Sequence, residues 1–386
     1  MGKTDTKQKN KKNLTAKKPK EKAGRIDMPF LILVFLLLGI GLVMVASSSY
    51  VSAYYSKGDS YYYIKRQLLF AIAGIVIMFI VSVFDYHRMR KWAFLLLCVS
   101  VVLLVLVLIP GIGVKVNGAR RWLNFGIQFQ PSEVGKFAII VSFASYISAN
   151  YKQMKKFVVG VLPLLVMLGV VVFLVAIETH LSGAILILGI GVIMMFVGGV
   201  ALRYFIIAIG AGGVGLGGLI LFTPYMQSRI NMWLDPFSDP QGKGYQVIQS
   251  LYAIGSGGLL GLGLGQSRQK HLYIPEPYND YIFSITAEEL GFVGALAIIL
   301  LFIMLIWRGF TIAFHAKDKF GAMLVIGIVS RIAVQTILNI AVVTNAMPST
   351  GIGLPFFSYG GTSLMMLMFE VGVVLSVSRH SYMEKV

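Results

Sequence analysis

Apolar runs of roughly 20 residues recur along almost the whole chain, from Phe30 to Ser378. This is the length that an α-helix needs to cross the hydrocarbon core of a bilayer. The runs are continuous and do not alternate with a period of two. Because backbone polar groups must be satisfied within lipid, this pattern favours helices over a β-barrel. With 57% hydrophobic residues, the chain is predicted to be an all-α polytopic membrane protein.

The runs predict about ten membrane spans. Their approximate bounds are 28–50, 66–84, 92–110, 132–149, 158–177, 181–200, 203–222, 283–307, 320–346 and 362–379. An even number of spans places both ends of the chain on one side of the membrane. The connections "DYHRMRK", "NYKQMKK" and "WRGFTIAFHAKDK" are basic and fall on the side of the lysine-rich N-terminus. By the positive-inside rule, that side is predicted to be cytoplasmic.

Much of the formal net charge of +18 comes from residues 1–25, which are polar and contain no aromatic residue. Such a segment cannot bury enough apolar surface to fold. We therefore predict a disordered basic cytoplasmic tail over 1–27, a membrane domain over 28–380 and a cytoplasmic C-terminus over 381–386. The tail is interpreted as facing anionic membrane lipid and not nucleic acid. The alternative is a solvated topology signal that has no partner.

A large polar segment, residues 223–282, separates the predicted seventh and eighth spans and is expected outside the membrane. Its "YQVIQSLYAI" has apolar residues at helical spacing, which predicts a short helix along the outer face. Its "GSGGLLGLGLGQ" is interpreted as tight turns, because neither a preceding strand nor a Gly-Lys-Ser/Thr sequence supports a phosphate loop. Cys98 is the single cysteine, and no metal-binding spacing involves His180 or His271.

Cations accumulate in the predicted outer segments, against the positive-inside bias. They indicate an anionic ligand such as phosphate, with lipid head-group contact as the alternative. These cations are Arg120, Arg121, Arg229, Lys243, Arg268 and Lys270.

Asp280 lies where the large outer segment meets the predicted eighth span. A partly desolvated carboxylate at such a boundary has a raised pKa and is suited to act as a general base. The alternative is that Asp280 caps a helix that begins at Tyr281. Glu276 precedes it and is expected to support the outer rim. Glu288 and Glu289 lie further into the apolar run, where carboxylates normally face a cavity or a cation.

Two other predicted spans carry possible partners for these carboxylates. Glu133 and Lys136 are three residues apart and share one helix face, either as a buried structural pair or as substrate contacts. Arg331, Gln335 and Asn339 are four apart and form one polar stripe, which must face protein or water. The stripe is either helix-packing contact or part of a site, and Glu370 in the last span is its expected complement.

Three separated motifs resemble one known family. They are "QPSEVGK", the run from "GKGYQVIQSLYAI" to "IPEPYNDYIFSITAEELGFVG", and "GIGLPFFSYGGTS". These motifs and their order along the chain resemble those of the shape, elongation, division and sporulation proteins, which include RodA, FtsW and SpoVE. The resemblance covers nearly the whole chain after the lysine-rich tail.

The resemblance implies a ten-span peptidoglycan glycosyltransferase of a bacterial cytoplasmic membrane. Such an enzyme polymerises lipid II into undecaprenyl-pyrophosphate-linked glycan at the outer face, alongside a class B penicillin-binding protein. Asp280 matches the family's essential aspartate, and Glu133 and Lys136 match its Pro-Ser-Glu-x-x-Lys. Ser358, within the third motif, is expected among the substrate-binding residues.

One motif departs from the family pattern. Where many members have Gln-Pro-Asp-x-Gly-Thr, this chain reads "ETHLSG", with Glu178 in the glutamine position and His180 in the aspartate position. We therefore do not assign the family aspartate's role to His180, and Glu178 is the remaining candidate to supply the charge.

These observations combine into one hypothesis. Asp280 accepts the proton of a sugar hydroxyl that attacks the anomeric carbon, and outer cations (Arg121, Arg268, Lys270 and Lys136) stabilise the departing pyrophosphate. The alternatives are a flippase for lipid-linked precursors and a non-catalytic scaffold for a penicillin-binding protein. No cofactor is evident in the sequence, which leaves open a divalent cation held by substrate oxygens.

Overall fold

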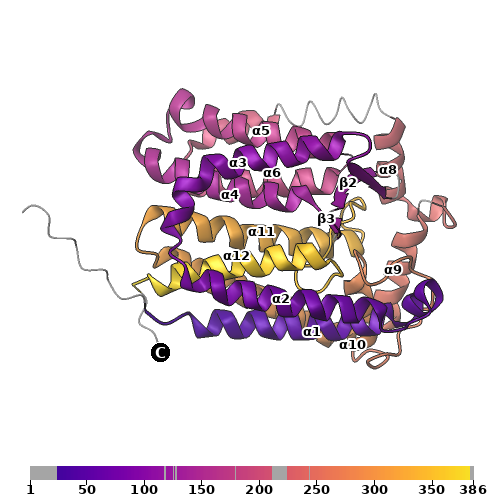
Figure 1. The fold of residues 1–386 in the computed structure, drawn as a ribbon. Coiled ribbons are helices and arrows are strands. Elements are labelled where there is room, and N and C mark those ends of the chain that lie inside the picture. The colour runs from indigo at the N-terminus through magenta and orange to yellow at the C-terminus, as the bar shows by residue number, and fades with distance from the viewer. Residues whose placement is uncertain are drawn as a thin grey trace, which may run out of the picture.

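The computed structural model describes residues 24–116, 119–124, 126, 128–178, 180–210, 224–242 and 244–382. Most of these residues are helical (Figure 1). The α-helices are α1 (Met28–Lys57), α2 (Tyr62–Val83), α3 (His87–Leu108), α4 (Pro131–Asn150), α5 (Leu162–Ile177), α6 (Leu181–Val197), α8 (Pro224–Leu234), α9 (Tyr245–Ser256), α10 (Ile282–Phe314), α11 (Lys319–Val343) and α12 (Gly361–Arg379). Residues 202–210 are also helical. Short helical segments are η1 (Tyr151–Gln153), η2 (Phe157–Val161) and η3 (Pro236–Ser238).

Seven described helices are long and apolar enough to cross a membrane, namely α1, α2, α3, the continuous η2 and α5, α10, α11 and α12. The apolar helix α6 is shorter, at 17 residues. The 20-residue helix α4 carries the charged Glu133 and Lys136 near its start. Most of the predicted span 203–222 lies outside the described residues. An all-α, multi-pass membrane architecture is therefore confirmed, whereas the total of ten spans stays a prediction.

Helix α11 lies in the middle of the bundle (Figure 1). It packs against α4 and α6 on one side and against α10 and α12 on the other. Its apolar stretch is largely buried, in contrast to α3, most of whose apolar side chains are exposed. A charged residue on α11 therefore faces protein, and Arg331 is among the largest fully buried side chains of the described residues.

The two described chain ends meet at one end of the bundle. The N–H of Gly24 donates to the carbonyl of Arg379 (2.8 Å), and Asp27 caps α1 by accepting from the N–H of Phe30 (2.9 Å). Asp27 also forms an ion pair with Arg308 (2.8 Å). Residues 24–27 thus have defined contacts, which corrects the predicted extent of the disordered tail. Residues 1–23 of the tail and 383–386 of the C-terminus lie outside the described residues.

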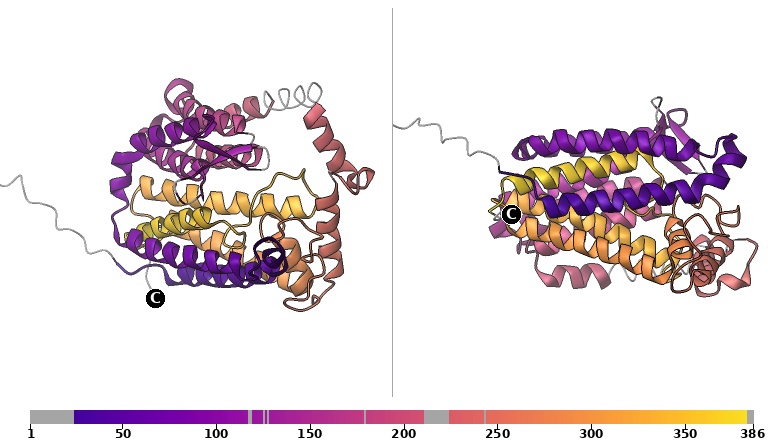
Figure 2. Two further views of the ribbon diagram at one scale, coloured as in Figure 1. Left: turned by 45° about the vertical axis from the view of Figure 1, so that its right-hand side comes forward. Right: turned by 90° about the horizontal axis from the view of Figure 1, so that it is seen from below.

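The opposite end of the bundle carries a small sheet and the helices α8 and α9 (Figures 1 and 2). The sheet is antiparallel, in the order β1 (Gly113–Val116), β2 (Ala119–Asn124) and β3 (Gln128–Phe129). It was not predicted, because its strands are short and follow a membrane span directly. The predicted short helix is confirmed as α9. The predicted turns are confirmed by positive φ angles at Gly258, Gly261, Gly263 and Gly265.

Candidate active site

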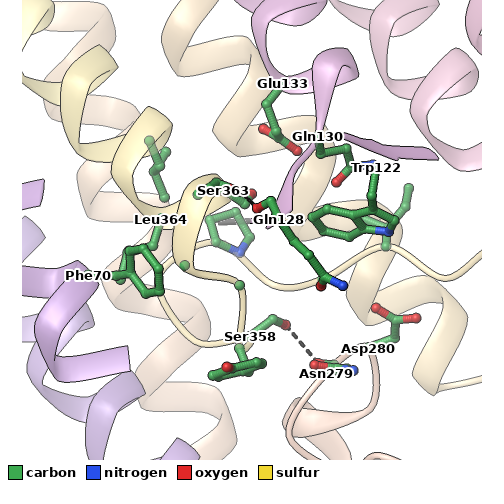
Figure 3. A pocket seen from close by; sticks show the side chains of 18 of the residues that line it. Phe70, Trp122, Gln128, Gln130, Glu133, Asn279, Asp280, Ser358, Ser363 and Leu364 are labelled. Atoms are coloured by element: carbon green, nitrogen blue, oxygen red, sulfur yellow. Dashed lines mark hydrogen bonds between the residues drawn. The ribbon is translucent and has the colours of Figure 1, made fainter. Parts of the chain in front are cut away.

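A cavity of about 960 Å³ lies at the end of the bundle that carries the sheet. Its walls come from α2, β2 and β3, the start of α4, the start of α6, and the segments 276–280 and 351–364 (Figure 3). Of the predicted site residues, those that line it are Arg121, Glu133, Lys136, Glu276, Asp280, Arg331, Gln335 and Ser358. The structure thus brings together residues from four separate parts of the chain.

Asp280 is held at the cavity by its backbone. The side-chain amide of Asn339 donates to the Asp280 carbonyl oxygen (2.8 Å), and the Ser358 hydroxyl donates to the carbonyl of Asn279 (2.8 Å; Figure 3). Helix α10 begins at Ile282, its N-cap is Tyr281, and the cap makes no side-chain hydrogen bond. The helix-cap alternative for Asp280 is therefore wrong. Among the described residues, the Asp280 carboxylate has no hydrogen bond or ion pair.

The surroundings of Asp280 change its acidity. Burial raises the pKa of Asp280 to about 6, the nearby carboxylate of Glu276 adds to the rise, and Arg121 opposes it. A carboxyl group with a pKa close to neutral is a better proton acceptor than an ordinary aspartate and is still mostly ionised at pH 7. The half-buried carboxylate is therefore suited to general-base chemistry.

Four buried charges form a chain on the inner wall of the cavity. Glu133 accepts from Lys136 (2.6 Å) and from Arg331 (2.6 Å), and Arg331 also pairs with Glu370. All four side chains are at most 6% exposed. The expected Glu133–Lys136 contact and the expected Glu370 complement to Arg331 are both present. Two carboxylates balance two cations, so this cluster adds little net charge to the cavity.

The rest of the polar stripe on α11 holds the segment that follows it. The amide of Gln335 donates to the carbonyl of Gly353 (2.8 Å), and that of Asn339 donates to the carbonyl of Ile352 (2.6 Å). The Ser358 hydroxyl accepts from the N–H of Leu354 (2.7 Å) in addition to its bond to Asn279. These three side chains therefore shape the wall of the cavity.

Three predicted substrate-binding cations do not line the cavity. Arg120 precedes Arg121 in β2, and of these two arginines only Arg121 lines the cavity. Lys270 is 4% exposed and pairs with Glu289 (2.9 Å), and the backbone N–H of Arg268 donates to Glu288 (3.0 Å). We therefore correct the expected pyrophosphate contact of Arg268 and Lys270. Lys243 lies outside the described residues.

Glu288 and Glu289 also lie away from the cavity. They were expected to pair with cations of the other spans, but most of their partners come from residues 265–270 of the loop before Asp280. The sequence did not identify these partners, because a carboxylate within an apolar helix indicates that a partner exists but not which residue it is.

The motif "ETHLSG", which differs from the family pattern, is mostly uncharged near neutral pH. Burial raises the pKa of Glu178 to about 8 and outweighs the opposing effect of Arg121. Burial also lowers the pKa of His180 to about 3, so its imidazole is neutral. His180 lines the cavity, with Nδ1 3.3 Å from the side-chain amide nitrogen of Gln130. Glu178 does not line the cavity, which corrects the expectation that it replaces the family aspartate.

Several residues of the cavity were missed by sequence reasoning. Lys57 and Arg66 line it, and their side chains lie over the ring of Tyr62, at 5.7 and 4.6 Å from its centroid. Neither cation has a carboxylate partner among the described residues. For Arg66 the available signal was the sequence "YIKRQ" at the start of the second span, an end predicted to be outside, where positive charge is unusual. Trp122 and Gln128 of the unpredicted sheet also line the cavity (Figure 3).

The bundle and its charged cavity define a multi-pass membrane protein with a polar chamber at one end. The chain belongs to the FtsW/RodA/SpoVE family of cell cycle proteins, whose model matches residues 28–383.

Two relatives illustrate the membership. The chain is 46% identical over 356 residues to stage V sporulation protein E of Bacillus subtilis (strain 168), covering 92% of this chain and 97% of that protein. It is 41% identical over 356 residues to the probable peptidoglycan glycosyltransferase FtsW of Trichlorobacter lovleyi, covering 91% and 93%.

Solved structures agree with the fold. A chain from a structure described as "Structural coordination of polymerization and crosslinking by a peptidoglycan synthase complex" matches with a TM-score of 0.79 and 28% identity, covering 93% of this chain and 99% of that one. The rod shape determining protein RodA of Thermus thermophilus matches with a TM-score of 0.67 and 27% identity, covering 93% and 98%.

Proposed function

We propose that this chain is a peptidoglycan glycosyltransferase that polymerises lipid II, with Asp280 as its general base. Relatives named as peptidoglycan glycosyltransferases, about 40% identical over most of the chain, support the reaction class. The observation that carries the mechanism is the Asp280 carboxylate, which lines the cavity, has no hydrogen-bond partner among the described residues and has a raised pKa.

The proposed step is a single displacement. An Asp280 carboxylate oxygen accepts the proton of the 4-hydroxyl of an N-acetylglucosamine in the acceptor. The freed oxygen forms a bond to the anomeric carbon of the donor, and the bond from that carbon to the lipid pyrophosphate breaks. The pyrophosphate leaves with the electron pair. One displacement inverts the configuration at the anomeric carbon.

Lys57 and Arg66, at the rim of the cavity, are the proposed contacts of the lipid pyrophosphates. Lys136 and Arg331 are already neutralised by Glu133 and Glu370, whereas Lys57 and Arg66 have no carboxylate partner among the described residues. Guanidinium and ammonium groups suit phosphate oxygens. The described residues contain no group of three or more potential metal-binding side chains. Any divalent cation is therefore proposed to be held through substrate oxygens.

The proposed orientation places the cavity outside the cell. The basic connections lie together, since Tyr86 bonds to Asp318 (2.5 Å) and Lys319 lies over the ring of Tyr151. They lie with a described chain end, because the N–H of Tyr382 donates to the carbonyl of His315 (3.0 Å). The positive-inside rule makes that end cytoplasmic, so the opposite end faces the outer surface, where lipid-linked sugars are polymerised. A class B penicillin-binding protein is the proposed partner, supported by the likeness to a chain of a peptidoglycan synthase complex.

The test is polymerisation of lipid II by the purified protein in detergent, with and without a cognate class B penicillin-binding protein. The proposal expects glycan strands from the wild-type protein and none from Asp280→Asn. Detergent removes the two sides of the membrane, so transport alone yields no polymer. Lipid movement across liposomes without polymer would instead identify a flippase. Partner binding with normal cell-wall synthesis by Asp280→Asn would identify a scaffold.

A further inference from the structure

Helix α10 is interrupted one-third of the way along its length. Gly291 has φ of 69° and ψ of −172°, which no helical residue adopts. The backbone groups around the break bond to the glycine-rich loop that precedes Asp280. The N–H groups of Phe292 and Val293 donate to the carbonyls of Gly258 (2.9 Å) and Leu259 (3.1 Å). The loop therefore replaces the missing helical hydrogen bonds, as burial in an apolar environment requires.

The contact depends on three glycines. A Cβ atom at Gly257 would overlap the carbonyl oxygen of Ala287, and one at Gly261 would overlap that of Glu289. A Cβ atom at Gly291 would overlap the backbone nitrogen of Gly261. The two backbones thus lie closer together than any side chain permits.

The two carboxylates just before the break hold the next part of the loop. Glu289 accepts from the N–H of Gly265 (2.9 Å), from Lys270 (2.9 Å) and from the Ser47 hydroxyl on α1 (2.7 Å). Glu288 accepts from the Ser267 hydroxyl and from the N–H groups of Arg268 (3.0 Å) and Gln269 (3.3 Å). Both carboxylates are at most 1% exposed. Their many donors offset the high free energy of burying charge.

This arrangement fixes both ends of the segment that carries Asp280. Residues 271–281 begin directly after the fixed Lys270 and end where the first part of α10, residues 282–290, begins. Within the segment, Leu272 and Glu276 have positive φ angles (68° and 48°), which are unfavourable for residues other than glycine. Such a backbone persists only when its surroundings hold it.

We propose that Gly257, Gly261, Gly291, Glu288 and Glu289 form a clamp that positions Asp280 for catalysis. This inference rests on the proposed function of Asp280. The clamp residues lie outside the cavity and contact no substrate, so they are positioning residues. Lys270 belongs to the same unit as the cation that neutralises Glu289. The clamp keeps the carboxylate at a fixed distance from Glu276, Arg121 and the reacting hydroxyl.

Gly257→Ala tests the clamp, with Gly255→Ala as its matched control. Both glycines lie at the end of α9 with φ in the helical range, and a Cβ atom at Gly255 meets nothing within 4 Å. The two variants therefore differ in the contact with the backbone of Ala287 and Glu288. The measurements are kcat, KM for lipid II and the pH profile of polymerisation, together with the unfolding temperature of each variant.

We expect kcat of Gly257→Ala to fall about 100-fold with KM little changed, as for a displacement of about 1 Å of a catalytic group. Its acidic pH limit should also move, because the acidity of Asp280 depends on its burial and its charged neighbours. Gly255→Ala should stay within about twofold of wild type, as most surface substitutions do. Equal kcat and equal pH limits for the two variants would overturn the proposal, as would a loss of stability without a loss of kcat.

Ser267→Ala is the milder second variant, and it decides the matter if Gly257→Ala does not fold. It removes the hydroxyl donor to Glu288 and the acceptor of the Lys270 N–H (3.2 Å). We expect about a tenfold loss of kcat and a moved pH limit, because one hydrogen bond to a charged group is lost. Unchanged kcat and pH limit would overturn the clamp. An inactive wild-type protein would instead refute the proposed function, so the two failures are distinguishable.

Discussion

The inner wall and the rim of the cavity handle charge in opposite ways. On the inner wall, Glu133, Lys136, Arg331 and Glu370 are buried and joined in one chain of ion pairs. At the rim, the carboxylate of Asp280 has no hydrogen bond or ion pair among the described residues, although its backbone is firmly held. Paired buried charges are stable and unreactive, whereas an unpaired carboxylate with a raised pKa is available for proton transfer. We therefore expect the inner wall to stabilise the fold and the rim to carry the proposed proton transfer.

The largest expected effect is at the rim. Asp280→Asn should lower the polymerisation rate by at least about 10²- to 10⁴-fold, the contribution of a general base. Its unfolding temperature should equal or exceed that of the wild type, because burial and Glu276 destabilise the ionised carboxylate. The measurement pairs strand synthesis with thermal unfolding in detergent. A stable Asp280→Asn variant with full activity would show that Asp280 is not the proton acceptor.

The inner wall should show the reverse behaviour. Arg331→Met should lower the free energy of unfolding by about 3–5 kcal/mol, because Glu370 is left as a buried charge without its partner and Glu133 keeps only Lys136. The double variant Arg331→Met/Glu370→Gln, in which Glu133 still pairs with Lys136, should recover much of this loss. Thermal or denaturant unfolding in detergent measures both. If the single variant is as stable as wild type, the inner wall is not a structural network.

The rim cations test how substrate is held. Arg66→Gln should raise KM for lipid II about tenfold, as expected for the loss of one charge-assisted contact to phosphate. Lys65→Gln is the matched control, because Lys65 pairs with Asp59 and its side chain is 66% exposed outside the cavity. Steady-state kinetics of both variants measure the difference. The same KM for both would remove Arg66 from the proposed binding site.

The smallest expected effect is on the pH profile. The deprotonated Asp280 is the active form, so activity should fall about tenfold per pH unit below about 6. Glu276→Gln removes a charge that raises this pKa, and should move the acidic limit down by less than about one pH unit, because burial is the larger cause. Arg121→Gln should move it upward. Movement of both limits in the same direction would show that another group controls the profile.

Local periodicity made the inner wall partly predictable. Glu133 and Lys136 are three residues apart on one helix, so their contact follows from helical geometry alone. Arg331, Gln335 and Asn339 share a face for the same reason, and their burial follows from the high free energy of placing polar groups in lipid. Asp280 was predicted from its place at a boundary and from the resemblance of its motif.

The partners of Glu288 and Glu289 were not predictable in the same way. Each carboxylate indicated a cation in another span, whereas the structure pairs them with backbone and side-chain donors of residues 265–270. That pairing requires the break at Gly291. The break could not be predicted from the glycine alone, because glycine is also common where membrane helices pack closely. Likewise, the unpredicted sheet decides that Arg121 and not Arg120 faces the cavity.

The sequence by itself determined the multi-pass helical fold and the Glu133–Lys136 pair along a single helix, because hydrophobic length and helical spacing act over a few turns. It also predicted Asp280 as the candidate proton acceptor. Only the tertiary structure decided which charges neutralise one another and which remain available to substrate. That choice depends on contacts between residues far apart in sequence, such as Arg331 with Glu133 and Glu370. Close packing and exclusion from water set these contacts, and no local pattern encodes them.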